Sequence, residues 1–284
     1  MNVGLRGLVI GVVLLLSACE PGPRTRQLNL PPRDPSAPGA SELAAAIADL
    51  DIGDREERLF VEISKGNVPS WLRHFTRVNL RREVGGREHR VTFWVTPDYV
   101  TVGSDIDFLP IPLTGRTAQK VADLVGATLP TPLMVDAIWA SARVRFAPVR
   151  IGPDEDMTTV RYFTRHADLI QSQRVVYGYS AGMFSAGHKL DVVLSPELSL
   201  NQGAVALYGW HQPNGDPIQP LYTRRMDGRP VFSHGIRLVH RTVLIDGEER
   251  DLLEVYTDPV LAELLSAKGA LEDPRYPTTA GDPR

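Results

Sequence analysis

Four segments before residue 177 carry apolar residues at the three- and four-residue spacing of a helix face. Each of the first three follows a Ser or Thr whose hydroxyl can accept a hydrogen bond from the first helical turn. The expected helices are residues 42–50, a segment that begins after Thr114 and ends near Gly126, a segment that begins with Pro132, and residues 157–174. Proline suits a first helical position because its missing N–H has no intrahelical partner there.

Alternating apolar and polar residues predict strands, most of them after residue 177. The expected strands are residues 90–96 and 99–103, forming a hairpin around Thr96-Pro97-Asp98, and residues 143–146, 190–194, 204–208, 235–245 and 251–255. Asp246-Gly247 is a hairpin-turn sequence, and a closing helix is expected from Thr257 or Asp258 to near Gly269. The pattern predicts an α+β fold, with helices mainly in the N-terminal half and an antiparallel, β-rich C-terminal half.

Polar, proline-rich segments flank the periodic part of the chain. Residues 19–41 contain many prolines and little apolar periodicity, which predicts a disordered tether. Residues 272–284 have a similar composition and are expected to form a disordered tail. The globular body is therefore expected to span residues 42–271, as one domain or as two halves that meet near residue 177.

Composition narrows the functional classes. The 284 residues include 31 Lys and Arg against 34 Asp and Glu, a net charge of −3. Nucleic-acid binders normally carry a basic excess, so no nucleic-acid partner is expected. The single cysteine excludes a disulfide framework, a cysteine-based zinc site and an iron–sulfur cluster. The basic residues on either side of Gly85-Gly86 are expected to belong to an exposed hairpin turn.

The N-terminus has the layout of a secretory signal peptide over residues 1–18. Arg6 supplies the positive charge, and Leu8 to Leu16 form the apolar run. Leu16-Ser17-Ala18-Cys19 resembles the lipobox of bacterial lipoproteins, in which the cysteine is diacylated and becomes the new N-terminus. The resemblance implies fatty acyl chains such as palmitate on Cys19. It also implies anchoring in the cell membrane or outer membrane, facing the periplasm or the exterior.

Candidate chemistry gathers at three strand–loop junctions of the C-terminal half, where a sheet can direct polar side chains into a common cleft. The candidate catalytic residues are His188 and Asp191 at one expected strand, His211 at the end of another, and Ser233 and His234 at the start of a third. If the three strands are neighbours, these side chains can converge.

Zinc hydrolysis is one chemistry that fits. Two imidazoles and a carboxylate are a usual catalytic zinc set, and the metal lowers the pKa of its bound water to about 7. His188, Asp191 and His234, or His211 in its place, would supply that set. The set is distantly similar to that of the zinc murein peptidases, which also use His, Asp and a later His but place the first two further apart.

Nucleophilic catalysis by a side chain is the other chemistry that fits. Ser233 to Leu238, Ser-His-Gly-Ile-Arg-Leu, resembles the Ser-His-Gly-Cys-x-Arg signature of L,D-transpeptidases, with His211 upstream. The catalytic cysteine of that signature is absent, so the resemblance transfers no activity. Ser233 would need His188 or His211 as its base, because the adjacent His234 points to the opposite face of a strand. Structural roles, such as capping of a strand entry by Ser233 and His234, stay open.

The expected function is a lipid-anchored cell-envelope hydrolase that acts on a cell-wall peptide or glycan, with Lys189 or Arg237 stabilising an anion. Its partners would be the membrane, through the lipid, and peptidoglycan or another envelope polymer. The alternative is a non-catalytic envelope lipoprotein that serves as a binding or scaffold module. Separation of the three histidine side chains in space would weaken the enzyme hypothesis.

Overall fold

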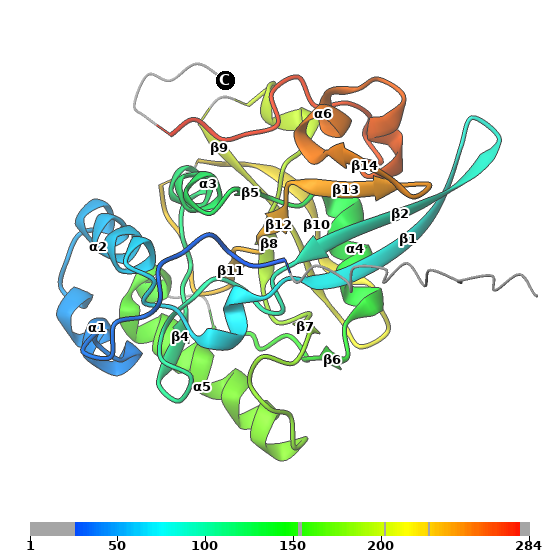
Figure 1. Cartoon of the computed structure of the whole chain (residues 1–284). Coiled ribbons are helices and arrows are strands. Elements are labelled where there is room, and N and C mark those ends of the chain that lie inside the picture. The colour runs from blue at the N-terminus through cyan, green and yellow to red at the C-terminus, as the bar shows by residue number, and fades with distance from the viewer. Residues whose placement is uncertain (1–25, 153–154, 202, 227, 279–284) are drawn as a thin grey trace, which may run out of the picture.

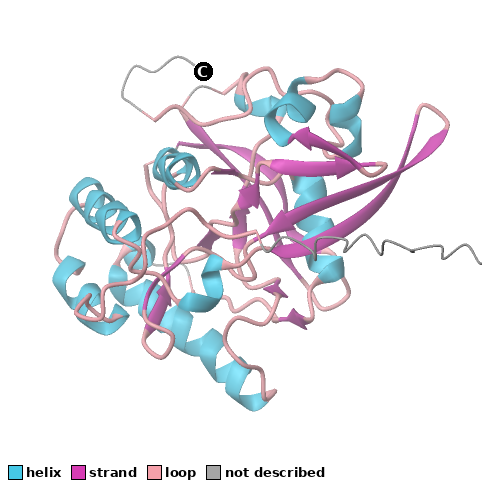
Figure 2. Cartoon of the chain, in the orientation of Figure 1, coloured by secondary structure: helices cyan, strands magenta, loops and turns pink. Residues whose placement is uncertain are grey.

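The computed structural model describes residues 26–152, 155–201, 203–226 and 228–278. The expected signal peptide and Cys19 lie outside these residues. Helices lie mostly in the N-terminal half of the chain and strands dominate the C-terminal half. Figure 2 shows the helices in cyan and the strands in magenta. The α-helices are α1 (Ala40–Ile47), α2 (Ile52–Ser64), α3 (Gly115–Leu124), α4 (Pro132–Ser141), α5 (Val160–Val176) and α6 (Leu252–Thr257). The 3₁₀ helices are η1 (Ser70–Arg73), η2 (Glu155–Thr158), η3 (Pro196–Leu198) and η4 (Leu261–Leu264). The predicted α+β class is confirmed.

Two sheets dominate the strand arrangement (Figure 1). The first has the order β14-β13-β2-β12-β5, with β1 paired to β2, and the second has the order β10-β9-β8-β11. The strands are β1 (Thr76–Val84), β2 (Arg87–Val95), β5 (Ala127–Thr128), β12 (Val239–His240), β13 (Thr242–Ile245) and β14 (Glu248–Asp251) in the first sheet, and β8 (Leu190–Val192), β9 (Ala204–His211), β10 (Pro217–Met226) and β11 (His234–Gly235) in the second. Two small pairs complete the set, antiparallel β3 (Thr101–Gly103) with β4 (Phe108–Pro110), and parallel β6 (Val144–Arg145) with β7 (Ser185–Ala186).

Local capping chemistry fixes two helices where the sequence predicts them. The Thr114 side chain accepts a hydrogen bond from the Thr117 backbone N–H at the start of α3. Thr131 does the same for the Met134 N–H, and Pro132 opens α4. Helix α1 departs from the prediction, because it begins at Ala40 and the Ser41 hydroxyl donates to Asp107 instead of capping.

The expected hairpin around Thr96-Pro97-Asp98 is wrong. Strand β2 pairs instead with β1 through the turn at Gly85-Gly86, where both glycines have positive φ (60° and 76°). A two-residue turn with two positive φ angles matches the twist of the flanking strands, and glycine adopts it without strain. The exposed basic hairpin turn predicted around these glycines is therefore present.

The closing region also differs from its prediction. The Asp246-Gly247 turn joins β13 to β14 as expected. The chain then enters α6, because the Asp251 side chain accepts a hydrogen bond from the Leu253 N–H and caps a helix where a strand was expected. The predicted helix after Asp258 is only the 3₁₀ turn η4, with Asp258 accepting from the Val260 and Leu261 N–H groups.

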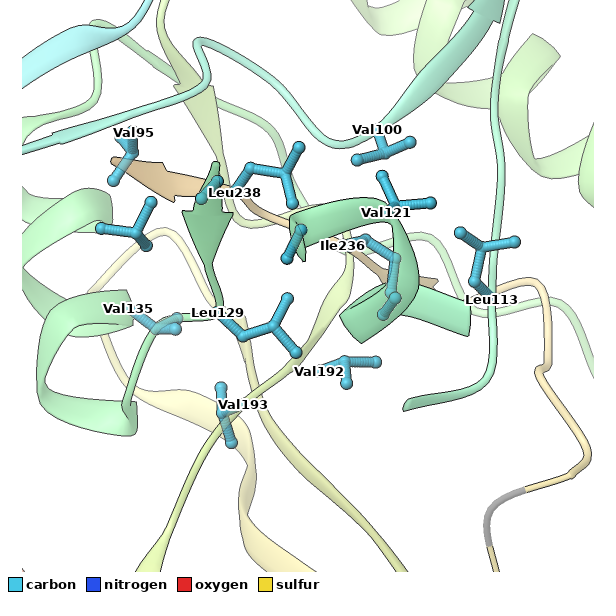
Figure 3. Packing of buried hydrophobic residues seen from close by; sticks show 14 of the residues in the cluster. Val95, Val100, Leu113, Val121, Leu129, Val135, Val192, Val193, Ile236 and Leu238 are labelled. Carbon is cyan, nitrogen blue, oxygen red and sulfur yellow. The ribbon is translucent and has the colours of Figure 1, made fainter. Parts of the chain in front are cut away.

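One hydrophobic cluster joins both halves of the chain. Figure 3 shows β-strand and loop residues from the C-terminal half beside residues from the N-terminal half. The labelled side chains are Val95, Val100, Leu113, Val121, Leu129 and Val135 from the first half, and Val192, Val193, Ile236 and Leu238 from the second. This shared core fixes the position of α3 and α4 relative to the strands that carry the candidate site.

The expected disordered segments are ordered where the structure describes them. The Arg26 guanidinium lies 3.7 Å from the Trp94 ring centroid and 2.9 Å from Glu249, and Leu28 is buried. At the other end Tyr276 is fully buried, and its hydroxyl donates to the Val193 carbonyl. Composition predicted disorder here, but these side chains find partners on the body. No helix in the described ranges is long and apolar enough to cross a membrane.

Candidate functional site

The second sheet brings the three predicted junctions together. Strand β8 lies between β9 and β11, so the strands that carry Asp191, His211 and His234 are neighbours. His188 and Lys189 immediately precede β8. The three strands are therefore neighbours, as the prediction required, but the candidate side chains lie in different environments.

Strand register explains the separation. In the parallel pair β8–β11, Leu190 faces His234 and Asp191 faces Gly235. Successive side chains of a strand point to opposite faces, so Asp191 and His234 lie on opposite sides of the sheet. Among the residues that the structure describes, no group of three His, Cys, Asp or Glu side chains is placed to hold a metal ion.

His188 belongs to a buried ionic chain that sequence analysis did not identify. Its Nε2 lies 3.4 Å from Asp98 Oδ1, and Arg174 Nη2 lies 3.0 Å from Asp98 Oδ2. All three side chains are at most 4% exposed. Asp98 follows β2, Arg174 is in the last turn of α5 and His188 precedes β8, so three separate segments meet here.

Burial and the neighbouring charges determine the protonation states of His188 and Asp98. Burial opposes ionisation of Asp98, but His188, Arg174 and Arg237 outweigh it and hold the pKa of the carboxyl far below its usual value. Burial lowers the pKa of His188, although Asp98 acts in the opposite direction. At neutral pH His188 is therefore a neutral imidazole, and it lies beside the ionised Asp98, which is paired with the Arg174 guanidinium.

A cavity of about 470 Å³, the ionic cavity, lies beside His188 and Arg174. Helices α1 and α5, strand β4 and residues 188–189 form its walls, and α1, β4 and α5 contact one another (Figure 1). Four buried basic side chains line it: His166, Arg174, His188 and Lys189. The partly exposed Asp107 and the exposed Asp168 also contribute to the lining.

Lys189 is a cation of this wall that has no carboxylate partner among the described residues. Its Nζ donates to the Phe232 carbonyl at 2.5 Å, and no carboxylate of a described residue lies within 4.0 Å of it. Burial lowers its pKa from 10.5 to about 7, although the charge of Asp98 acts in the opposite direction. A buried ammonium with a single acceptor retains two unused donors.

His166 has no polar partner at all among the described residues. The side chain is fully buried, and neither ring nitrogen makes a hydrogen bond. Its ring lies 5.2 Å from that of Phe232, centroid to centroid. Burial, followed by the charges of Lys189 and His188, lowers the pKa of His166, which is neutral at physiological pH.

Asp191 and Arg237 take part in a neighbouring network. The Tyr99 hydroxyl donates to Asp191 Oδ2 at 2.9 Å, and burial raises the pKa of this carboxyl to about 6. Arg237 lies 4.2 Å from the centre of the Tyr99 ring and donates to the carbonyls of Thr96 and Ser185. Arg237 therefore holds two backbone segments together, and Lys189 is the cation that faces the cavity.

His211 lies in a third environment. Its Nε2 is 2.9 Å from Asp136 Oδ1, which also accepts a hydrogen bond from the Tyr208 hydroxyl at 2.8 Å. The ring stacks on Trp139 at 5.7 Å. Asp136 is half-exposed, and this pair lies outside the cavity lined by His188.

Ser233 and His234 line a second, mainly apolar cavity of about 410 Å³, together with Trp210 and Phe232. Among the described residues, the Ser233 hydroxyl makes no hydrogen bond with His188 or His211. The base that a serine nucleophile requires is therefore not positioned at Ser233.

Three residues were absent from the predicted site: His166 and Arg174, which line the cavity, and Asp98, which pairs with Arg174 and His188. Asp98 was assigned to a hairpin turn, and no local signal marks its pairing with a histidine distant in sequence. A signal did exist for the other two. His166, Ile170 and Arg174 recur every four residues on the buried face of α5, and two basic residues on an otherwise apolar helix face are unusual.

Comparison with known proteins adds no relative. No protein-family model, no curated protein and no solved structure matches this chain.

Proposed function

We propose that this protein is a lipid-anchored cell-envelope hydrolase that acts on a cell-wall peptide or glycan, with its reaction centre in the cavity lined by His188. The lipid anchor rests on the lipobox at Cys19. The catalytic assignment rests on one observation, the chain from His188 to Asp98 to Arg174 at the cavity wall.

His188 has the properties of a general base. Asp98 Oδ1 lies 3.4 Å from Nε2, within ion-pair distance, and neither ring nitrogen makes a hydrogen bond to a described residue. A neutral imidazole oriented by a carboxylate is the usual arrangement for removing a proton from a nucleophile. Arg174 keeps Asp98 ionised, so the proton that His188 accepts stays on the imidazole.

Water is the nucleophile that this arrangement supports. For an amide bond of a peptide, or an ester carried by a glycan, His188 would take a proton from water as the water oxygen bonds to the substrate carbonyl carbon. The proton would then pass to the leaving nitrogen or oxygen as its bond to that carbon breaks. The ammonium of Lys189 provides positive charge in the same cavity.

Binding without catalysis is the competing function. It is favoured by the separation of His188, His211 and His234 into three environments, which weakens the enzyme hypothesis. It is also favoured by the fact that no described hydroxyl or thiol donates to His188. An envelope module could use the same cavity to hold a polymer end. Cleavage of the envelope polymer distinguishes the hydrolase from the binding module.

Digestion of purified peptidoglycan sacculi tests the proposal. The full-length chain in detergent is incubated with sacculi, with and without a metal chelator, and released fragments are identified by mass spectrometry. We expect chelator-resistant release that is lost in His188→Ala and retained in His89→Ala, whose imidazole lies on the exposed β1–β2 hairpin. No release, or equal release by His188→Ala, would contradict the hydrolase.

Chelator-sensitive release would show that the reaction requires a metal ion, although the structure places Asp191 and His234 of the predicted zinc set on opposite sides of the sheet. Release that depends on Ser233 would assign the reaction to the second cavity. In either case His188 and Asp98 would lose the role given to them here.

A further inference from the structure

We infer that the ionic cavity binds a carboxylate of its ligand, and that the ligand is an acyl peptide ending in a small aliphatic residue with a free carboxylate. The inference rests on the proposed function for the statement that this ligand is a substrate. Binding itself depends only on the cavity.

Charge is the first argument. Arg174 is paired with Asp98, whereas Lys189 has no carboxylate of a described residue within 4.0 Å. A buried, unpaired cation is costly, and an anion that enters the cavity would remove that cost. Among the buried side chains the excess is one ammonium, whereas the partly exposed Asp107 and the exposed Asp168 add negative charge to the lining. One negative charge therefore fits better than two, which favours a carboxylate over a phosphate dianion.

Unused hydrogen-bond donors are the second argument. Lys189 uses one acceptor, the Phe232 carbonyl, and has two further N–H groups. His166 is fully buried, lines the same cavity, and has no partner for either nitrogen among the described residues. A neutral imidazole carries one N–H donor, so Lys189 and His166 together offer donors to both oxygens of a carboxylate.

The remaining walls indicate which kind of residue bears the carboxylate. Ala44, Leu109, Ala167 and Ile170 present short or branched apolar side chains to the cavity. These suit a small aliphatic residue, and the polar side chains of Ser41, Thr164 and Gln171 in the same lining can hydrogen-bond the peptide backbone. His188 is adjacent to Lys189 in the chain, so a peptide held by its carboxylate would present a bond near its C-terminus to the base.

Calorimetric titration at pH 6.5 tests the inference. The full-length chain in detergent is titrated with N-acetylalanine, with the neutral N-acetylalanine amide, and with inorganic phosphate. We expect N-acetylalanine to bind at least about tenfold more tightly than either comparator, because each lost charged hydrogen bond of about 1.5 kcal/mol or more corresponds to roughly a factor of ten.

Variants identify the residues responsible. Lys189→Met and His166→Phe should each weaken N-acetylalanine binding at least about tenfold, and Lys189→Arg should retain part of it. Lys65→Met, at an exposed lysine, is the matched control and should bind as the parent does. His166→Phe preserves the bulk of the buried ring, so loss of binding in a folded His166→Phe variant cannot be ascribed to misfolding.

Equal binding of the acid and the amide, tighter binding of phosphate, or unchanged binding in Lys189→Met would overturn the inference. Its failure is distinguishable from failure of the hydrolase. Carboxylate binding without release from sacculi would remove the enzyme and keep the site, whereas release without carboxylate binding would remove the site and keep the enzyme.

Discussion

Replacing Lys189 with methionine should stabilise the protein at acidic and neutral pH, with a gain that disappears as pH rises. Lowering the lysine pKa from 10.5 to about 7 corresponds to roughly 5 kcal/mol against the charged form, at about 1.4 kcal/mol per pH unit. The unfolded chain binds more protons than the folded one between these two pKa values. The free energy of unfolding of the parent therefore rises with pH from about 7 to 10.5 and is lowest below 7.

Methionine has no such charge, so the difference between variant and parent isolates the lysine. We expect Lys189→Met to be more stable by a few kcal/mol at pH 6, less the hydrogen bond to Phe232 and any packing change. The groups acting on Lys189 are Asp98, which favours its charge, and the basic side chains His166, His188 and Arg174 that share its cavity.

Urea unfolding at pH 6, 8 and 9.5, followed by circular dichroism, measures this difference. Lys65→Met is the control for removing an exposed lysine, and it should show a small difference that is the same at each pH. A stability difference for Lys189→Met that does not change with pH, or that grows as pH rises, would refute the argument that Lys189 is buried and charged in the folded protein.

Further predictions concern the neighbours of Lys189. Asp98→Asn leaves Arg174 buried without its counter-charge and should lower the free energy of unfolding by about 3–5 kcal/mol in urea titration; a loss below about 1 kcal/mol would show that the pair is hydrated. His166→Phe removes two unsatisfied buried nitrogens and should raise stability by about 1–3 kcal/mol while weakening carboxylate binding; destabilisation would mean that His166 has a partner. Gly235→Ala puts a methyl group 2.6 Å from the Lys189 Cβ and 2.6 Å from the Tyr99 ring, which should cost about 1–3 kcal/mol in thermal unfolding; a neutral effect would show that these side chains can move apart.

Predictions from sequence succeeded where the determining interaction is local. The Thr114 and Thr131 caps involve residues three positions apart, and the Asp246-Gly247 turn depends on two adjacent residues. Such interactions are visible in a short segment of sequence. The same reasoning failed at Thr96-Pro97-Asp98, because the alternative partner of β2, on the other side of Gly85-Gly86, offered a longer register.

The candidate site was predictable only in part. His188 was identified from its position before a strand, and the adjacency of β8, β9 and β11 supports that logic. Its partner could not be identified, since the contact with Asp98 depends on how two sheets and α5 pack together. The face on which each side chain lies also depends on strand register, which places Asp191 and His234 on opposite sides.

The ordered segment after Arg26 limits how far the body can stand from a membrane. Arg26 is held by Trp94 and Glu249 on the surface of the first sheet. Under the proposed acylation of Cys19, only seven residue-to-residue links connect the lipid-bearing Cys19 to Arg26. Fully extended, they span at most about 25 Å. The anchor would then limit the reach of the body, so the proposed hydrolase would act only on the layer of envelope polymer closest to the bilayer.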